Sequence, residues 1–248
     1  MDVQVKAATD IGLKRPQNED HYALWIPSVP AVRARRGVLL VVADGMGGAQ
    51  AGEVASHMAV ERLLEAWRQG QGEPLEDLRH AVEAANRTVH VESLTHPERQ
   101  GMGTTLTALV VRGHEVLVAH VGDSRAWLVR DGAARQLTVD HTLVAQLVRD
   151  GHITAEEARV DPRRNVVTRS VGVAPDVRVD VARVSEPLRE GDVLVLSTDG
   201  LHGLVSDAEL AERASLPDLA AACDALVALA RERGGPDNIT VVVARVVP

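Results

Sequence analysis

A short apolar run that ends in an aspartate and a group of glycines constrains this chain most. The run Val38–Ala43 predicts a buried strand, because six consecutive apolar residues bury both faces. Helical spacing of apolar residues follows, so a carboxylate leaves a rigid strand where glycines let the backbone approach a small group. Asp44, with the carbonyl of Gly45, suits a hard cation, although an Asp-Gly turn is an equally simple interpretation. The glycine-rich stretch reads Asp44, Gly45, Met46, Gly47, Gly48.

The composition excludes several classes of function. The chain has 248 residues with 27 Lys and Arg against 35 Asp and Glu, a net charge of −8. This balance argues against bulk binding of nucleic acid or of an anionic membrane. The single cysteine, Cys223, allows no internal disulfide and lies in an apolar helical pattern, which predicts a core residue. We find no signal peptide and no apolar run near the ~20 residues that span a bilayer, and therefore expect a cytoplasmic protein.

The order of the periodic segments predicts one α+β domain over residues 1–248. Residues 27–37 read as an exposed loop, and the four strands between residues 104 and 137 read as a meander. Residues 138–170 interrupt the strands, and about 140–170 reads as a flap on the surface. Strands are expected at 3–10, 21–26, 38–43, 104–111, 115–121, 125–130, 134–137, 177–183, 192–198 and 239–247. Helices are expected at 52–69, 74–94, 143–149, 154–159, 207–214 and 216–233.

Four acidic positions share one pattern, since each lies at the end of a predicted strand beside Gly or Asn. Each alone is a turn or a surface charge pair, but together they would place like charges at one edge of the sheets. Divalent cations compensate such charges, and all-oxygen ligands favour Mg²⁺ or Mn²⁺ over Zn²⁺. None of the ten histidines has a zinc-binding spacing such as H-E-x-x-H. The four positions are Glu19 with Asp20, Asp44, Asp199 and Asp237.

Eight motifs in order resemble a known family. They are RPQNED, ADGMGG, GMGTT, HVGDSR, LTVDH, NVVTRSVG, STDG and PDNIT, and they run from about Val5 to Val246. The sequence is similar to the metal-dependent (type 2C, or PPM) serine/threonine protein phosphatases, and most similar to the bacterial single-domain type. The resemblance implies a four-layer α-β-β-α sandwich, in which two antiparallel sheets are flanked by helices.

The resemblance also implies a centre for two Mn²⁺ or Mg²⁺ ions at one end of the sandwich. By its motifs, Asp44 would bind both ions. Asp199 and Asp237 would complete the ligands of the first ion, and Glu19 and the Gly45 carbonyl would bind the second. Asp20 would order metal-bound water, and Arg15 would hold the substrate phosphate. A hydroxide that bridges the metals would attack phosphorus directly, so neither Ser124 nor Thr198 is expected to be a nucleophile.

This sequence departs from the family pattern at three places. Met46 stands where some members carry a histidine as general acid, and it has no proton to donate. Gly203 stands where an aspartate often helps to hold a third metal, which leaves Asp123 and Asp199 as ligands for a weakly bound third ion. The neighbouring His202 is an alternative ligand, although a loop histidine is usually a surface residue. Asp161 in the flap replaces a frequent histidine, which leaves substrate preference there open.

The resemblance implies phosphorylated serine and threonine proteins as partners, with protein kinases and their substrates among them. We expect a free-standing, monomeric enzyme without nucleic-acid or membrane partners. Two alternatives stay open: a phosphatase for one dedicated phosphoprotein, and a non-catalytic phosphoprotein-binding protein on the same fold.

Overall fold

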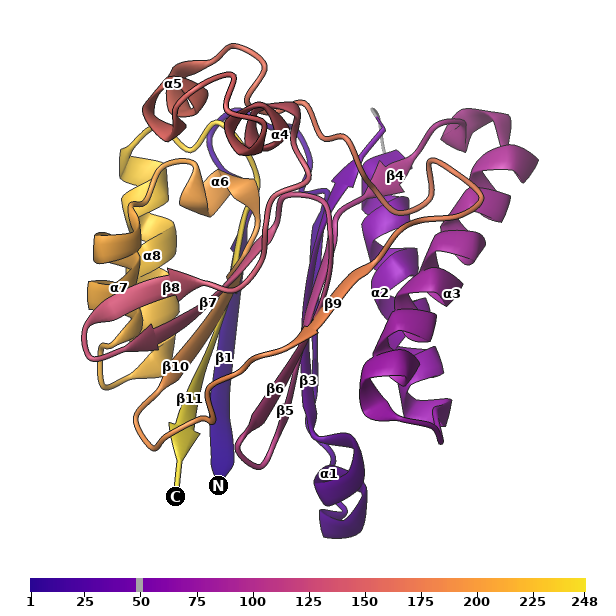
Figure 1. The fold of residues 1–248 in the computed structure, drawn as a ribbon. Coiled ribbons are helices and arrows are strands. Elements are labelled where there is room, and N and C mark those ends of the chain that lie inside the picture. Colours follow the sequence, from indigo (N-terminus) through magenta and orange to yellow (C-terminus); the bar gives the residue numbers. More distant parts are fainter. Residues whose placement is uncertain (48–50) are drawn as a thin grey trace.

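Two antiparallel sheets form the centre of the computed structural model, which describes residues 1–47 and 51–248 (Figure 1). Gly48, the last glycine of the predicted cluster, lies outside the described residues. The first sheet has the strand order β1 (Asp2–Asp10), β11 (Ile239–Val247), β10 (Val193–Ser197), β7 (Arg125–Arg130) and β8 (Ala133–Gln136). The second has the order β2 (Asp20–Trp25), β3 (Val38–Met46), β5 (Leu106–Arg112), β6 (Glu115–Val121) and β9 (Asp180–Arg183), and β4 (Gly103–Thr104) pairs with β3.

Helices cover the outer face of each sheet and complete four layers. Helices α2 (Ala51–Gln69) and α3 (Pro74–Thr95) lie on the second sheet, while α7 (Asp207–Ala214) and α8 (Leu219–Glu232) lie on the first (Figure 1). A third apolar cluster fills the space between the sheets. The predicted α-β-β-α sandwich is therefore confirmed.

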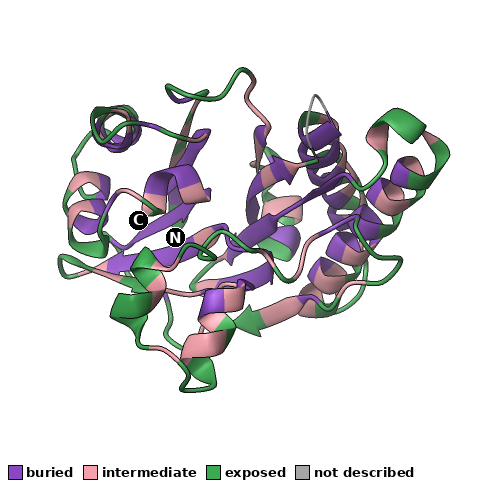
Figure 2. Cartoon of the chain, turned by 90° about the horizontal axis from the view of Figure 1, so that it is seen from above, coloured by how far each residue is buried: buried purple, intermediate pink, exposed green. Residues whose placement is uncertain are grey.

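Unbroken apolar strands are what this layering requires. Along β3, Leu39 and Val41 pack toward the helices, whereas Leu40 and Val42 pack toward the opposite sheet. Strand β10 divides its residues between two clusters in the same way. Seen from above the sandwich, buried residues follow the strands and the inner helix faces (Figure 2). A strand between two apolar layers loses the alternating pattern, which is why these runs were recognisable from the sequence.

The predicted meander is wrong at its centre, because β6 and β7 belong to different sheets. The chain crosses between the sheets at Gly122–Ser124 instead of making a hairpin. Gly122 has a φ of +110°, and a Cβ there would lie 2.6 Å from the side chain of Thr105, so the crossover requires glycine. The crossover carries Asp123 between the two sheets.

The predicted exposed loop at residues 27–37 is also wrong in part. Helix α1 (Pro30–Arg36) forms there with Pro30 in its first turn, and it ends in a buried arginine. Arg36 donates hydrogen bonds to Asp77 Oδ2 (2.6 Å) and to the Trp67 carbonyl (2.5 Å), and its guanidinium lies 3.6 Å from the centre of the Trp67 ring. The sequence could not indicate Trp67 as a partner of Arg36, because the two residues are 31 positions apart.

Two other details differ from the sequence interpretation. Strand β3 continues through Asp44 to Met46, because Gly45 and Met46 pair with β4. Asp199 opens a short helix, α6 (Asp199–His202), where no helix was predicted. His202 is therefore not a loop residue on the surface: its Nδ1 lies 3.0 Å from Ser197 Oγ and its ring meets the Trp127 ring edge.

The segment predicted as a flap carries two short helices, α4 (Leu143–Arg149) and α5 (Ala155–Val160), at the end of the sandwich away from the termini (Figure 1). Helix α5 begins with a capping box, in which Thr154 and Glu157 each bind the other's backbone N–H. The segment is joined to the body by His141, whose backbone N–H donates to the Gly122 carbonyl and whose Nδ1 accepts from the Gly122 N–H.

The single cysteine is a core residue, as predicted. Cys223 is buried in α8, and burial raises the pKa of its thiol to about 11. Among the described residues, no helix combines the length and the apolar character needed to cross a bilayer.

The buried arginine of α1 generates a stability prediction. We expect Arg36→Ala to lower the free energy of unfolding by about 3–5 kcal/mol, because Asp77 loses its buried partner. Urea unfolding monitored by tryptophan fluorescence measures this change. Arg33→Ala in the same helix is the control, since its ion pair with Asp2 is solvent-exposed and is worth at most about 1 kcal/mol. Equal effects of the two substitutions would contradict the assigned role of Arg36.

Candidate metal centre

The predicted acidic residues meet at the end of the sandwich opposite the chain termini. Asp20 and Asp44 are paired across β2 and β3, while Asp199 follows β10 and Asp237 precedes β11 in the other sheet. A hydrogen bond connects the carboxylates of the two sheets, because Thr198 Oγ1, next to Asp199, donates to Asp20 Oδ2 at 2.8 Å. Thr198 in turn accepts from the Thr240 N–H, so both sheets fix the orientation of Asp20.

Asn238 holds the loop that carries Glu19, a role that sequence reasoning missed. Its side-chain amide donates to the carbonyls of Ile11 and Gln17 at 2.9 and 2.8 Å, and its Oδ1 accepts from the Glu19 N–H at 2.8 Å. Asn238 is buried next to Asp237. The only sequence signal was the Asp-Asn pair that opens the final strand.

Two threonines fix the backbone of Asp44. Thr105 Oγ1 accepts from the Asp44 N–H at 2.8 Å, and the Asp44 carbonyl accepts from Thr104 Oγ1 at 2.9 Å. The buried Ser124 hydroxyl lies 2.6 Å from Thr105 Oγ1. Ser124 therefore supports Asp44 through Thr105, and its buried hydroxyl is poorly placed for attack on a substrate.

Close backbone packing explains the glycine at position 45. A Cβ on Gly45 would lie 2.1 Å from the Gly52 carbonyl oxygen and 2.6 Å from that of Glu19. The Gly45 N–H donates to the Glu19 carbonyl, which also accepts from Ser56 Oγ at 2.6 Å. Any side chain at position 45 would separate Glu19 from Asp44.

Burial among like charges perturbs these carboxyl groups strongly. Burial, followed by the charges of Asp199 and Asp237, raises the pKa of Asp20 to about 7, although hydrogen bonds from threonines oppose the shift. Burial and the neighbouring carboxylates also raise the pKa of Asp44 well above its usual range, and that of Asp199 in the same direction. Asp20 Oδ1 and Asp199 Oδ1 are buried without a hydrogen-bond partner among the described residues.

Arg15 is the cation of this group. Its guanidinium donates to Asp237 Oδ2 at 2.6 Å and is about half exposed. The hydrogen bond that Arg15 donates to Asp237, with the charges of Asp237, Asp44 and Glu19, raises the pKa of Arg15 despite partial burial. Burial raises the pKa of Glu19, and Arg15 opposes that shift. An exposed guanidinium beside the carboxylates is accessible to an anion from solvent.

Asp123 lies close enough to the group to interact with it. Burial and the charges of Asp199 and Asp140 raise its pKa to about 7. Gly203 is exposed at the end of α6 and adds no carboxylate, while Asp161 forms an ion pair with Arg163 in the flap. Met46 lies in β3, two residues beyond Asp44.

Comparisons with known proteins agree with this architecture. A family model described as "Protein phosphatase 2C" matches residues 17–237. Protein phosphatase PhpP of Streptococcus pneumoniae is 37% identical over 245 residues, which cover 96% of each chain. The crystal structure of the serine/threonine phosphatase PstP/Ppp of Mycobacterium tuberculosis is 37% identical, covers 100% of both chains and has a TM-score of 0.88. A structure of the PstP catalytic domain "in complex with 2 Manganese ions" is 37% identical, with 99% of both chains covered and a TM-score of 0.84.

The fold and these relatives define the class. The chain belongs to the protein phosphatase 2C family and is a serine/threonine protein phosphatase. The resemblance inferred from the eight motifs is confirmed.

The buried carboxylates generate a prediction for the metal-stripped protein. A carboxyl group whose pKa is raised by folding stabilises the fold below its unfolded pKa of about 4 and loses that contribution as pH rises through its folded pKa of about 7. Asp20→Asn removes this titration. In EDTA, we therefore expect Asp20→Asn to match the wild type near pH 4 and to exceed its stability at pH 8 by up to about 4 kcal/mol.

Urea unfolding in EDTA between pH 4 and pH 8 measures this difference, with the exposed Asp150→Asn as the control. A stability difference between Asp20→Asn and the wild type that does not change with pH would show that Asp20 titrates normally.

Proposed function

We propose that this phosphatase hydrolyses phosphoserine and phosphothreonine in proteins with the help of two Mn²⁺ or Mg²⁺ ions held by the acidic group. The proposed ligands are Glu19, Asp20, Asp44, the Gly45 carbonyl, Asp199 and Asp237, with Asp123 and Asp199 for a weaker third ion. Asp44 and Arg15 are the proposed catalytic residues.

The donor set supports hard divalent cations. All the proposed ligands are oxygen atoms, which Mg²⁺ and Mn²⁺ prefer. The pKa values of Asp20 and Asp44 are raised, and one oxygen each of Asp20 and Asp199 has no hydrogen-bond partner among residues 1–47 and 51–248. Both observations mark buried charge that these described residues do not compensate. This uncompensated charge is the main support for the proposed metal centre. The manganese ions in the PstP structure lend further support.

The residues of the chain have separate tasks in this proposal. When bound, the ions supply Lewis acidity that lets water attack phosphorus near neutral pH. Arg15 binds the phosphoryl oxygens through its two-pronged guanidinium and releases Asp237 in exchange. Thr198 keeps Asp20 oriented, and Thr105 keeps Asp44 in place. No protein nucleophile is used, since the Ser124 hydroxyl is buried and hydrogen-bonded and Cys223 lies in the core.

We further propose a cytoplasmic, monomeric enzyme that opposes serine/threonine protein kinases, with residues 1–248 as one catalytic domain and residues 140–170 as a flap over the site. The position of α4 and α5 at the end of the sandwich supports a role of the flap in substrate choice (Figure 1). A panel of phosphopeptides distinguishes a general phosphatase from one with a dedicated substrate.

The metal ligands generate the first functional prediction. We expect hydrolysis of p-nitrophenyl phosphate and of a phosphothreonine peptide to require Mn²⁺ or Mg²⁺ and to stop in EDTA. Asp44→Asn should reduce kcat at least about 1,000-fold, because it removes a charge from both proposed metal sites. Circular dichroism verifies the fold of the variant.

Asp224→Asn, which removes an exposed carboxylate of α8 on the outer face of the sandwich, is the matched control and should keep full activity. Full activity of Asp44→Asn, or of both Asp199→Ala and Asp237→Ala, would refute the ligand assignment. A folded wild type that is inactive with every metal would favour a phosphoprotein-binding role.

Arg15 generates a prediction about substrate binding. We expect Arg15→Lys to lower kcat/KM for the phosphopeptide by about 10–100-fold, because lysine keeps the charge but loses the two-pronged contact. Steady-state kinetics measures the change, with the exposed neighbour Lys14→Ala as control. An unchanged kcat/KM would place the phosphate elsewhere.

A further inference from the structure

Three potential metal ligands outside the carboxylate group come together on the outer side of β2. His21, His57 and Glu61 have ligand atoms that all lie within 4.8 Å of one another. His57 and Glu61 are one turn apart on α2 and therefore share a face of the helix. His21 follows Asp20 in β2, and the alternation of a strand directs it to the opposite side, toward α2.

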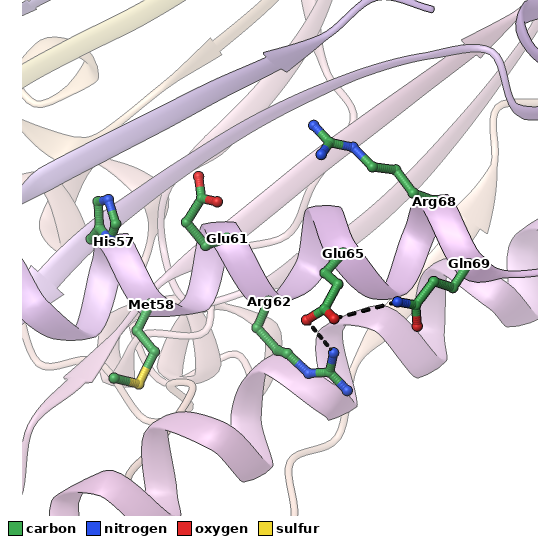
Figure 3. Close-up of a pocket in the computed structure, with 7 residues that line it drawn as sticks. All are labelled: His57, Met58, Glu61, Arg62, Glu65, Arg68 and Gln69. Atoms are coloured by element: carbon green, nitrogen blue, oxygen red, sulfur yellow. Dashed lines mark hydrogen bonds and ion pairs between the residues drawn. The ribbon is translucent and has the colours of Figure 1, made fainter.

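The three side chains are available for coordination. In the described part of the chain, none of them takes part in a hydrogen bond or an ion pair between residues, whereas the nearby Glu65 is bound to Arg62 at 2.6 Å. The rings of His21 and His57 lie with their centres 4.7 Å apart. His57 and Glu61 project from the same side of α2, away from Met58 and Arg62 (Figure 3).

We propose that His21, His57 and Glu61 form a binding site for one Zn²⁺ ion, separate from the carboxylate centre. Two imidazoles and one carboxylate are a donor set that Zn²⁺ prefers and that Mg²⁺ and Mn²⁺ do not. Ligand atoms around a tetrahedral Zn²⁺ lie about 3.3 Å apart, given bonds of about 2.0 Å, so small side-chain rotations close the site. His57 and Glu61 are exposed, which leaves them free to rotate and leaves the fourth position to water.

The bound ion would connect β2 to α2 at the segment that supplies the carboxylate centre. Ser56, next to His57, donates to the Glu19 carbonyl, and His21 follows Asp20 directly. Zn²⁺ at this site therefore stabilises the folded chain by mass action and fixes the start of β2. The proposal does not depend on the function proposed above, since its ligands are different residues.

Equilibrium dialysis against micromolar Zn²⁺ in excess Mg²⁺ tests the site on the whole chain, because Mg²⁺ competes for the oxygen ligands. We expect the wild type to hold one more Zn²⁺ per chain than His57→Ala. Glu61→Gln should weaken this binding by about 10–100-fold, the loss seen when even supporting residues of metal sites are removed. The Zn²⁺-dependent rise in melting temperature should disappear in His57→Ala.

Two matched controls are available. Glu65→Gln lies one turn further along α2, and His152→Ala removes an exposed histidine of the flap. Both should bind Zn²⁺ as the wild type does. Circular dichroism without Zn²⁺ verifies that all four variants fold, which is expected because the substituted side chains are exposed.

Nuclear magnetic resonance of the histidine ring nitrogens locates the ion directly. We expect Zn²⁺ to shift the signals of His21 and His57 and to leave that of His152 unchanged. Equal Zn²⁺ binding by His57→Ala and the wild type, or bound Zn²⁺ that leaves both ring signals unchanged, would overturn the proposal and assign the Zn²⁺ to the carboxylate centre.

Discussion

Mutual repulsion among buried carboxylates is the constraint on which the end of this sandwich depends. Asp20 and Asp44 come from one sheet and Asp199 from the other, and burial together with their neighbours raises the pKa of each. Such a group is stable only with protons or cations. The surrounding structure holds it together regardless: Thr198 and Thr105 supply hydrogen bonds, and Gly45 permits close packing.

The sequence predicted the parts of the fold that depend on local pattern. Unbroken apolar runs identified β3 and β10 because both their faces are buried, and each run pointed to the aspartate that follows it. Contacts between distant residues were not predictable. Arg36 read as a surface residue because its partners Trp67 and Asp77 are remote in sequence, and the meander failed because local pattern does not reveal which sheet a strand joins.

Strand β2 contributes to two separate groups of side chains. Its alternation places Asp20 among the carboxylates between the sheets and His21 beside His57 and Glu61 of α2. No short histidine motif announced the second group, because its members come from β2 and α2. In the same way, Asn238 was recognisable only as a turn residue until the structure showed which loop it holds.

We infer that the buried carboxylates exchange protons for divalent cations. Calorimetric titration of the chelated protein with Mn²⁺ at pH 6.5, in two buffers of different ionisation enthalpy, tests it most directly. We expect two ions to bind with release of about one proton or more per chain, because groups with a pKa near 7 must be deprotonated to bind. Binding without proton release, or unchanged binding by Asp199→Asn, would contradict it.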